Sequence, residues 1–349
     1  MTTANVKPGM TMQALTQRPE GLVAIDREMA RQNADALASF REAAPTAERL
    51  AASLRRTGRL LLLGMGGSHA VGRAVEPLYR ACGIDAVAIP LSEQLGEPLS
   101  LHGRTVVVTS QSGESAEVVR WFKETGARDD VFGLTLEAGS FLGRTAPCLV
   151  GAGGTERAFA ATRSLTVTFA LHLAILHALD EDAAPAIHAL ETAQGIDITP
   201  ALAALEGVAT VVTSGRRLQG LAETIALGLT ELSRLPCYAL EGGQLRHGPM
   251  EMLGPKVGIV LFRGDDPTGD LVAGLATAIA QAGSPAIVFD ASGAEPAQGA
   301  VTLRFQPASG LAAIFAMLPT AQRLMIAFAD SRVDNAGTPV RSTKITRDE

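Results

Sequence analysis

Residues Val106-Val107-Val108-Thr109-Ser110-Gln111-Ser112-Gly113-Glu114-Ser115 join a β-branched apolar run to a loop rich in hydroxyl groups. The apolar run predicts a buried strand of a parallel sheet, and residues 116–122 continue with the spacing of a helix. A loop between a strand and a helix offers free backbone N–H groups and the positive end of a helix dipole. We therefore predict a cradle for a phosphate monoester of a polyol-like molecule; a hydroxyl-capped helix without a ligand is the alternative.

The first half of the chain alternates short apolar strands with helical segments. Residues 1–20 are polar and predict an extended arm, and residues 25–54 have the spacing of a helix. Strands are predicted over residues 59–64, 86–90, 105–108, 131–136 and 148–150, and a long apolar helix over 165–179. This alternation predicts a parallel sheet covered by helices on both faces.

The second half repeats the same order, and its first strand also runs into a small-residue turn. Strands are predicted over residues 208–213, 257–262, 286–289 and 301–305, with helices ending near residues 234 and 329. The predicted fold class is therefore α/β, with two tandem doubly wound parallel-sheet (flavodoxin-like) domains. The predicted parts are an N-terminal arm and helix over 1–45, a first domain over 46–182, a second domain over 200–330 and a C-terminal tail over 331–349.

Length, charge and cysteine usage exclude several classes of protein. The chain has 349 residues, which exceeds the usual size of one domain. A net charge of −6 without basic clusters argues against nucleic acid as a partner. Cys82, Cys148 and Cys237 are odd in number and far apart, which favours reduced thiols over disulfides or a zinc site. With no signal sequence and no apolar run of membrane-spanning length, we expect a cytoplasmic protein without a membrane partner.

The turn Gly64-Met65-Gly66-Gly67-Ser68 is similar to a dinucleotide-binding turn, but two features argue against that interpretation. The dinucleotide motif needs a third glycine where this chain has His69, and the strand predicted over residues 86–90 carries no acidic residue. The phosphate-binding loop pattern of nucleotide hydrolases is absent as well. We therefore expect no nucleotide cofactor.

Further motifs follow one another along the chain in a fixed order. They are Gly64–Ser68, Ser92-Glu93, Thr109–Ser115, Gly153–Glu156, Ala160–Thr166 and Gly243-Gln244-Leu245-Arg246-His247-Gly248-Pro249-Met250. In this order they resemble the SIS (sugar isomerase) family, and the last is similar to its Gly-Glu-x-x-His-Gly-Pro signature. The closest resemblance is to the isomerase half of glucosamine-6-phosphate synthase and to stand-alone phosphosugar isomerases and deaminases.

The resemblance implies a role for particular side chains. Glu231 would be the base that moves a proton between C1 and C2, His247 would open the sugar ring from a second subunit, and Lys344 would be the tail lysine able to form a Schiff base. The residues that would hold the phosphate are Ser68, Ser110, Gln111, Ser112 and Ser115, and those beside the sugar are Gly67, Ala160 and Ala161. Without the family, Glu231 could pair with Arg234 on a solvated face, and His247 could cap a turn.

Chemistry independently favours these residue types. Exchange of an aldose and a ketose needs one base with access to both carbons, and a partly buried carboxylate suits this because burial raises its pKa toward neutrality. Ring opening needs a second proton shuttle, for which histidine titrates in the appropriate range.

Three departures from the family pattern bear on the reaction. The glutamine-hydrolysing domain of the synthase is not expected here, Gly228 stands where the synthase has a lysine, and Ala161-Thr162-Arg163 replaces Ser-Thr-Lys. The leading hypothesis is an isomerase or deaminase that converts glucosamine 6-phosphate to fructose 6-phosphate and ammonia. It would work without metal or organic cofactor, as a homodimer with a shared active site and a tail that closes it. The alternatives are a fructosamine-6-phosphate deglycase, a plain aldose–ketose isomerase, or a sugar-phosphate sensor without catalysis.

Overall fold

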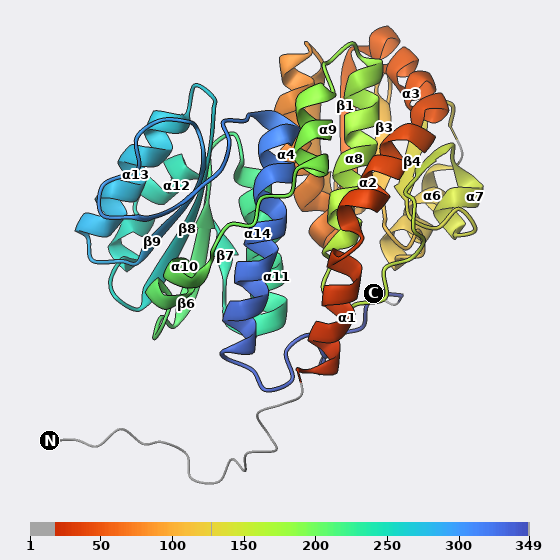
Figure 1. The fold of residues 1–349 in the computed structure, drawn as a ribbon. Coiled ribbons are helices and arrows are strands. Elements are labelled where there is room, and N and C mark those ends of the chain that lie inside the picture. The colour runs from red at the N-terminus through yellow and green to blue at the C-terminus, as the bar shows by residue number, and fades with distance from the viewer. Residues whose placement is uncertain (1–17, 127, 348–349) are drawn as a thin grey trace, which may run out of the picture.

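Two five-stranded parallel sheets form the framework of the computed structural model, which describes residues 18–126 and 128–347 (Figure 1). The first sheet has the order β2-β1-β3-β4-β5 and the second the order β10-β9-β8-β6-β7. The strands are β1 (Arg59–Gly64), β2 (Asp85–Pro90), β3 (Thr105–Thr109), β4 (Val131–Thr135), β5 (Cys148–Val150), β6 (Thr210–Ser214), β7 (Tyr238–Ala239), β8 (Val257–Gly264), β9 (Ala286–Ala291) and β10 (Val301–Arg304). The predicted fold class, two tandem doubly wound domains, is confirmed.

The N-terminal helical region differs from the prediction of one helix over residues 25–54. It consists of three helices, and Pro45 in the first turn of the third explains one of the breaks, because proline cannot donate a backbone hydrogen bond. The helices of the first half are α1 (Glu20–Met29), α2 (Gln32–Glu42), α3 (Ala44–Thr57), α4 (Gly66–Ala81), α5 (Leu91–Gly96), α6 (Ala116–Thr125), α7 (Phe141–Thr145) and α8 (Arg163–Ala178). The arm predicted over residues 1–20 lies almost wholly outside the described residues.

The segment predicted to join the two domains, residues 183–200, contains one helix and the start of another. The helices of this part of the chain are α9 (Ala184–Glu191), α10 (Thr199–Ala204), α11 (Gln219–Ser233), α12 (Gly242–Arg246), η1 (Pro249–Met252), α13 (Gly269–Gln281) and α14 (Gly310–Asp330). Helix α9 packs against α14 and α2, so this connection is part of the packed body rather than a free linker. The two-residue strand β7 was not predicted, because so short a strand has no periodicity to detect.

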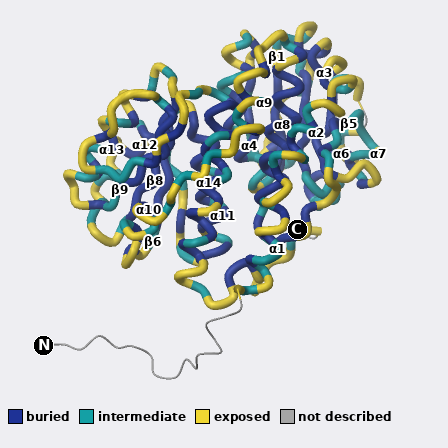
Figure 2. The backbone as a smooth tube through the Cα atoms, viewed as in Figure 1, coloured by how far each residue is buried: buried dark blue, intermediate teal, exposed yellow. Residues whose placement is uncertain are grey.

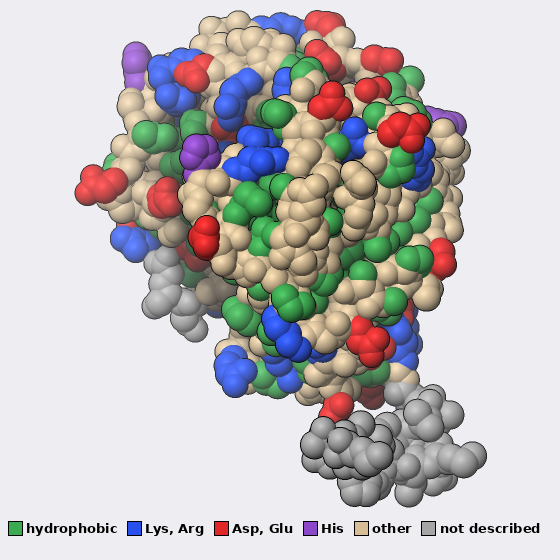
Figure 3. Space-filling view, turned by 90° about the vertical axis from the view of Figure 1, so that its left-hand side faces the viewer, with side chains coloured by type: hydrophobic (Ala, Val, Ile, Leu, Met, Phe, Trp, Pro, Cys, Tyr) green, Lys and Arg blue, Asp and Glu red, His purple; other side chains and the backbone are tan. Residues whose placement is uncertain are grey.

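The largest hydrophobic core lies between the two sheets and includes α4, α8, α11 and α14 (Figure 2). Side chains of β1 alternate, so Leu60 and Leu62 face this central core while Leu61 and Leu63 face a second core on the outer side of the sheet. A third core lies between the second sheet and α13. On the face turned toward the viewer in Figure 3, basic and acidic side chains are interspersed.

Helix α14 corrects one expectation from the sequence. By length and composition it could cross a membrane, although no apolar run was expected to be long enough. However, 78 % of its most apolar 18-residue stretch is buried inside the protein, and the helix packs against α9 and α11. Burial on this scale is what a central core helix requires.

Candidate active site

A cavity of about 320 Å3 lies at the carboxyl ends of β1 and β3. These neighbouring strands lead in opposite directions along the sheet, β1 through α4 to β2 and β3 through α6 to β4, and such switch points are where open α/β sheets bind ligands. The cavity is lined by Met65, Gly66, Gly67, Ser68, Thr109, Ser110, Gln111, Ser112, Ser115, Glu117, Thr155, Glu156, Phe159, Ala161, Leu227, Glu231 and the tail residues 342–346. It therefore brings together five segments that are far apart in sequence.

The loop after β3 presents hydrogen-bond donors to this cavity. The backbone N–H groups of Gln111, Ser112 and Ser115 donate to no residue within 18–126 or 128–347, and the Gln111 Nε2 atom is buried without a partner there. Gly113 gives the loop its shape: its φ is +66°, and a Cβ at this position would overlap the Ser140 hydroxyl. The Ser110 Oγ accepts a hydrogen bond of 3.1 Å from the Gly113 N–H, which fixes the turn.

Two helices begin at this cavity. Ser68 lies in the first turn of α4, and Ser115 is the N-cap of α6. The side chains of Ser115 and of Met65, the N-cap of α4, accept no capping hydrogen bond. Backbone N–H groups in the first turn of each helix are therefore free to bind a ligand, although the Ala116 N–H of α6 is taken by the tail. Together with the loop, the two helix ends form a site suited to a phosphate dianion without a lysine.

Glu231 reaches the cavity from the far end of α11. Burial raises the pKa of its carboxyl to about 7, with Lys344 lowering the pKa and Glu156 raising it. In the part of the chain that the structure describes, no group donates a hydrogen bond to this carboxylate. The alternative pairing with Arg234 does not occur, because that guanidinium donates instead to the Thr338 carbonyl oxygen at 3.1 Å.

The tail covers the cavity and is attached at two points. The Lys344 Nζ donates to the Glu156 Oε2 at 3.0 Å and to the Phe159 carbonyl oxygen at 3.3 Å. The Ala116 N–H at the start of α6 donates to the Thr346 carbonyl oxygen at 3.1 Å. These contacts place the Lys344 ammonium in the same cavity as Glu231.

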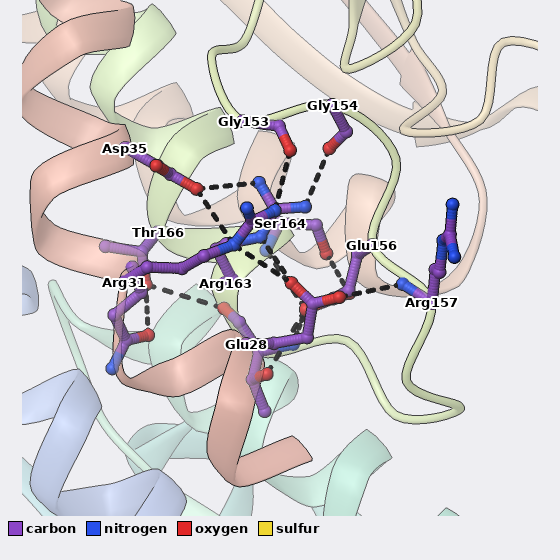
Figure 4. A network of polar contacts seen from close by, with 12 residues as sticks. Glu28, Arg31, Asp35, Gly153, Gly154, Glu156, Arg157, Arg163, Ser164 and Thr166 are labelled. Carbon is purple, nitrogen blue, oxygen red and sulfur yellow. Dashed lines mark hydrogen bonds and ion pairs between the residues drawn. The ribbon is translucent and has the colours of Figure 1, made fainter. Parts of the chain in front are cut away.

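Glu156 is the main site residue that the sequence did not single out. Its side chain is only 2 % exposed and accepts hydrogen bonds from the backbone and hydroxyl groups of Thr162 and Ser164 as well as from Lys344 (Figure 4). These donors fix the position of the carboxylate, which in turn holds the Lys344 ammonium in place. Glu156 is the last residue of one of the quoted motifs, so it lay within the sequence signal. Its donors Thr162 and Ser164, however, lie six to eight residues further along the chain.

Arg163 fixes the segment that carries Glu156. The guanidinium is fully buried and donates to Glu28 at 2.6 Å, to Asp35 at 3.2 Å and to the Gly154 carbonyl oxygen at 2.7 Å (Figure 4). Helices α1 and α2 therefore hold the closing segment of the site through one arginine. This residue stands where the family motif has lysine, and Arg, with five donors in a planar fork, suits several acceptors at once.

The remaining predicted residues divide between the cavity and other places. Gly67 and Ala161 line the cavity, whereas Ala160 is fully buried in the central core and does not line it. Gly228 is buried against Met325, and a side chain there would have to displace the Met325 sulfur.

His247 lies outside this cavity. It is exposed at the end of α12, where its backbone N–H donates to the Gln244 carbonyl oxygen at 3.1 Å. The prediction that it serves the site of a second subunit stays a prediction.

The chain is similar in sequence to a known protein over part of its length. No family model matches the chain. Over 240 residues, 60 % of the chain, it is 31 % identical to the glutamine–fructose-6-phosphate aminotransferase (isomerizing) of Aeropyrum pernix, and it spans 38 % of that protein's length.

Solved structures share the fold at lower sequence identity. The tagatose-6-phosphate ketose/aldose isomerase of Escherichia coli has a TM-score of 0.76 at 18 % identity, covering 93 % of this chain and 99 % of that one. The glucosamine-6-phosphate deaminase of Thermotoga maritima has a TM-score of 0.67 at 18 % identity, covering 89 % and 99 %. The resemblance predicted from the motifs is thereby confirmed: the chain is similar to phosphosugar isomerases of the SIS type and has their fold.

Proposed function

We propose that this protein is a phosphosugar isomerase of the deaminating type, which converts an amino-sugar 6-phosphate, best glucosamine 6-phosphate, to the ketose 6-phosphate and ammonia. The observation that carries the proposal is the position of Glu231. Its carboxyl has a pKa of about 7 and faces the same cavity as the donor-rich loop after β3. A phosphate site and a base poised near neutral pH are the two parts that enolisation of a sugar phosphate requires.

The proposed reaction begins with the open-chain sugar held by its phosphate. The loop after β3 and the ends of α4 and α6 bind the phosphate oxygens, and the Glu231 carboxylate removes the proton from C2. The enolamine that results takes a proton at C1, which gives the ketose imine. Water then adds to the imine carbon and ammonia leaves, so one water is consumed and one ammonia is released.

Lys344 stabilises charge in this scheme. Its ammonium is held 3.0 Å from Glu156 and beside Glu231, where it can donate to the sugar oxygen that gains negative charge during enolisation. A Schiff-base route would require the ammonium to leave Glu156 and lose a proton. His247, supplied by a second copy in a homodimer, would open the sugar ring.

Two of the alternatives would use the catalytic residues of this site, and a third would only bind the sugar phosphate there. A plain aldose–ketose isomerase needs the same base, and the name of the structurally similar E. coli protein favours keeping it as the second candidate. A fructosamine-6-phosphate deglycase would depend on Lys344 as a nucleophile. A sensor would bind the sugar phosphate without exchanging its C2 proton.

Proton NMR of the protein with glucosamine 6-phosphate in deuterated buffer tests the proposal. We expect the C2 proton signal to disappear while fructose 6-phosphate labelled at C1 and ammonia accumulate. Glu231→Gln should abolish the exchange and keep phosphate-ester binding. Glu223→Gln is the matched control, because Glu223 lies two turns earlier on the same helix with a pKa also raised by burial, but outside the cavity. Exchange that persists in Glu231→Gln would exclude Glu231 as the base.

A further inference from the structure

Helices α4 and α11 are arranged reciprocally across the centre of the molecule. They pack against each other, and Gly220 lies so close to the backbone of Ala74 that a Cβ would not fit. Helix α4 begins at the candidate active site, and α11 reaches that site with its last turns, at Leu227 and Glu231. If α4 and α11 exchange these roles in the second domain, that domain has a position corresponding to the active site. The start of α11 and the later turns of α4 define this position.

A cavity of about 300 Å3 lies at that position. Arg216, Arg217 and Gln219 line it from the turn after β6 and the first turn of α11, and Arg73, Pro77 and Arg80 line it from α4. Glu241, after β7, and Thr268, after β8, complete the lining.

In the second sheet, β6 and β8 are neighbours whose connections run in opposite directions, as β1 and β3 are in the first. The cavity therefore lies at the switch point of the second sheet, where the same rule places a ligand.

The charges in this second cavity favour an anion. Arg216 donates to Glu241 at 2.9 Å, but its Nε–H is buried without an acceptor in the described chain. Arg73 pairs with the buried carboxylate of Glu76 at 2.6 Å, leaving its remaining donors available. Arg217 has no hydrogen-bond or ion-pair partner anywhere in residues 18–126 and 128–347.

The carboxylates nearby are already engaged. Glu241 accepts from Arg216 and from two backbone N–H groups of α12, Glu76 accepts from Arg73 and Arg80, and Glu223 lies 3.9 Å from Arg73. The second cavity is thus lined by four guanidiniums, those of Arg73, Arg80, Arg216 and Arg217. That of Arg217 has no counter-ion among the described residues. Arginine is the residue that binds phosphate oxygens with paired donors.

We propose that this arginine-lined cavity is a second ligand site, specific for the phosphate group of a small organic phosphate, and that it binds without catalysing. The cavity that corresponds to the active site carries no carboxylate in place of Glu231: Pro77 and Arg80 of α4 lie there instead. A neighbouring cavity of about 380 Å3 shares Pro77 and Arg217 with it. Its lining includes Leu78 and Leu311 together with the carboxylates of Glu181, Asp182, Asp265 and Asp266, so it provides space for the uncharged organic part of the ligand and not for a second anionic group.

Equilibrium dialysis of the full chain with radiolabelled inorganic phosphate tests the proposal. We expect two classes of site per chain, one weakened by Ser112→Ala and the other weakened about tenfold or more by Arg217→Gln. Arg49→Gln removes an exposed arginine of α3 far from both cavities and is the matched control for the change in net charge. Because Arg217 is exposed and has no partner to lose, its variant should keep the thermal midpoint of the parent protein.

The outcomes separate this proposal from the proposed function. Loss of one class in Arg217→Gln, with the Ser112-dependent class unchanged, supports a second site even if the protein proves inactive on glucosamine 6-phosphate. A single class of site that Arg217→Gln does not alter overturns the proposal. An equal weakening by Arg49→Gln and Arg217→Gln overturns it too, because the effect would then be one of overall charge.

Discussion

The titration of Glu231 makes the most direct prediction about this site. With a carboxyl pKa of about 7, half of the molecules carry the ionised base at pH 7. At pH 6 the ionised fraction falls to about one in eleven, so C2 proton exchange at saturating substrate should be roughly fivefold slower than at pH 7. Above about pH 8 the rate should be constant, because the base is then almost fully ionised.

Replacing Lys344 with Met should move this profile in a known direction. The ammonium lowers the pKa of Glu231, so its removal should shift the midpoint of the profile upward by about one pH unit. The shift distinguishes an electrostatic effect on the base from a role of Lys344 in binding alone, which would slow exchange equally at all pH values.

The assay is the initial rate of C2 proton loss, followed by NMR in deuterated buffers from about pH 5.5 to about pH 9 at saturating substrate. Saturation matters because the substrate phosphate itself titrates near pH 6, and the rate of the bound complex is insensitive to binding. A rate already constant above pH 5.5 would show that Glu231 titrates as an ordinary carboxyl, and an unmoved midpoint in Lys344→Met would refute the electrostatic coupling.

Three further predictions concern stability. Glu231→Gln should raise the free energy of unfolding at about pH 8 by roughly 3 kcal/mol but leave it nearly unchanged at about pH 4. A carboxyl pKa raised from 4.5 to about 7 means that stability is lost as the pH rises through this range, and urea titrations at the two pH values check this. Gly220→Val should cost about 3 kcal/mol, seen as a lower thermal midpoint, since its side chain would overlap the backbone of Ala74; an unchanged midpoint would mean that the two helices separate easily. Arg163→Met should cost roughly 3–5 kcal/mol in urea unfolding because it leaves the carboxylate of Glu28 with only its longer ion pair, to Arg31 at 3.6 Å, and a loss below about 1 kcal/mol would contradict the role given to this network.

Local patterns were sufficient for most of the framework. The strands near residues 59–64 and 105–108 were predicted because runs of three or four consecutive apolar residues, Leu60–Leu63 and Val106–Val108, followed by glycine-containing turns have few other conformations available. Patterns failed where the signal is not local: residues 25–54 have helical spacing throughout, and although Pro45 marks the second break, no local residue marks the first, between α1 and α2, where α2 packs against α8 and α9.

For the candidate site, the sequence by itself determined the donor-rich loop at residues 109–115, because a parallel strand that ends in hydroxyls and glycine before a helix exposes backbone N–H groups wherever it occurs. Only the tertiary structure decided that Glu231 titrates near neutral pH and that Lys344 is held by Glu156. Both facts depend on desolvation and on charges brought together from segments up to 188 residues apart. Such distances in the chain leave no periodicity to detect, since burial and electrostatic coupling exist only after the elements have packed.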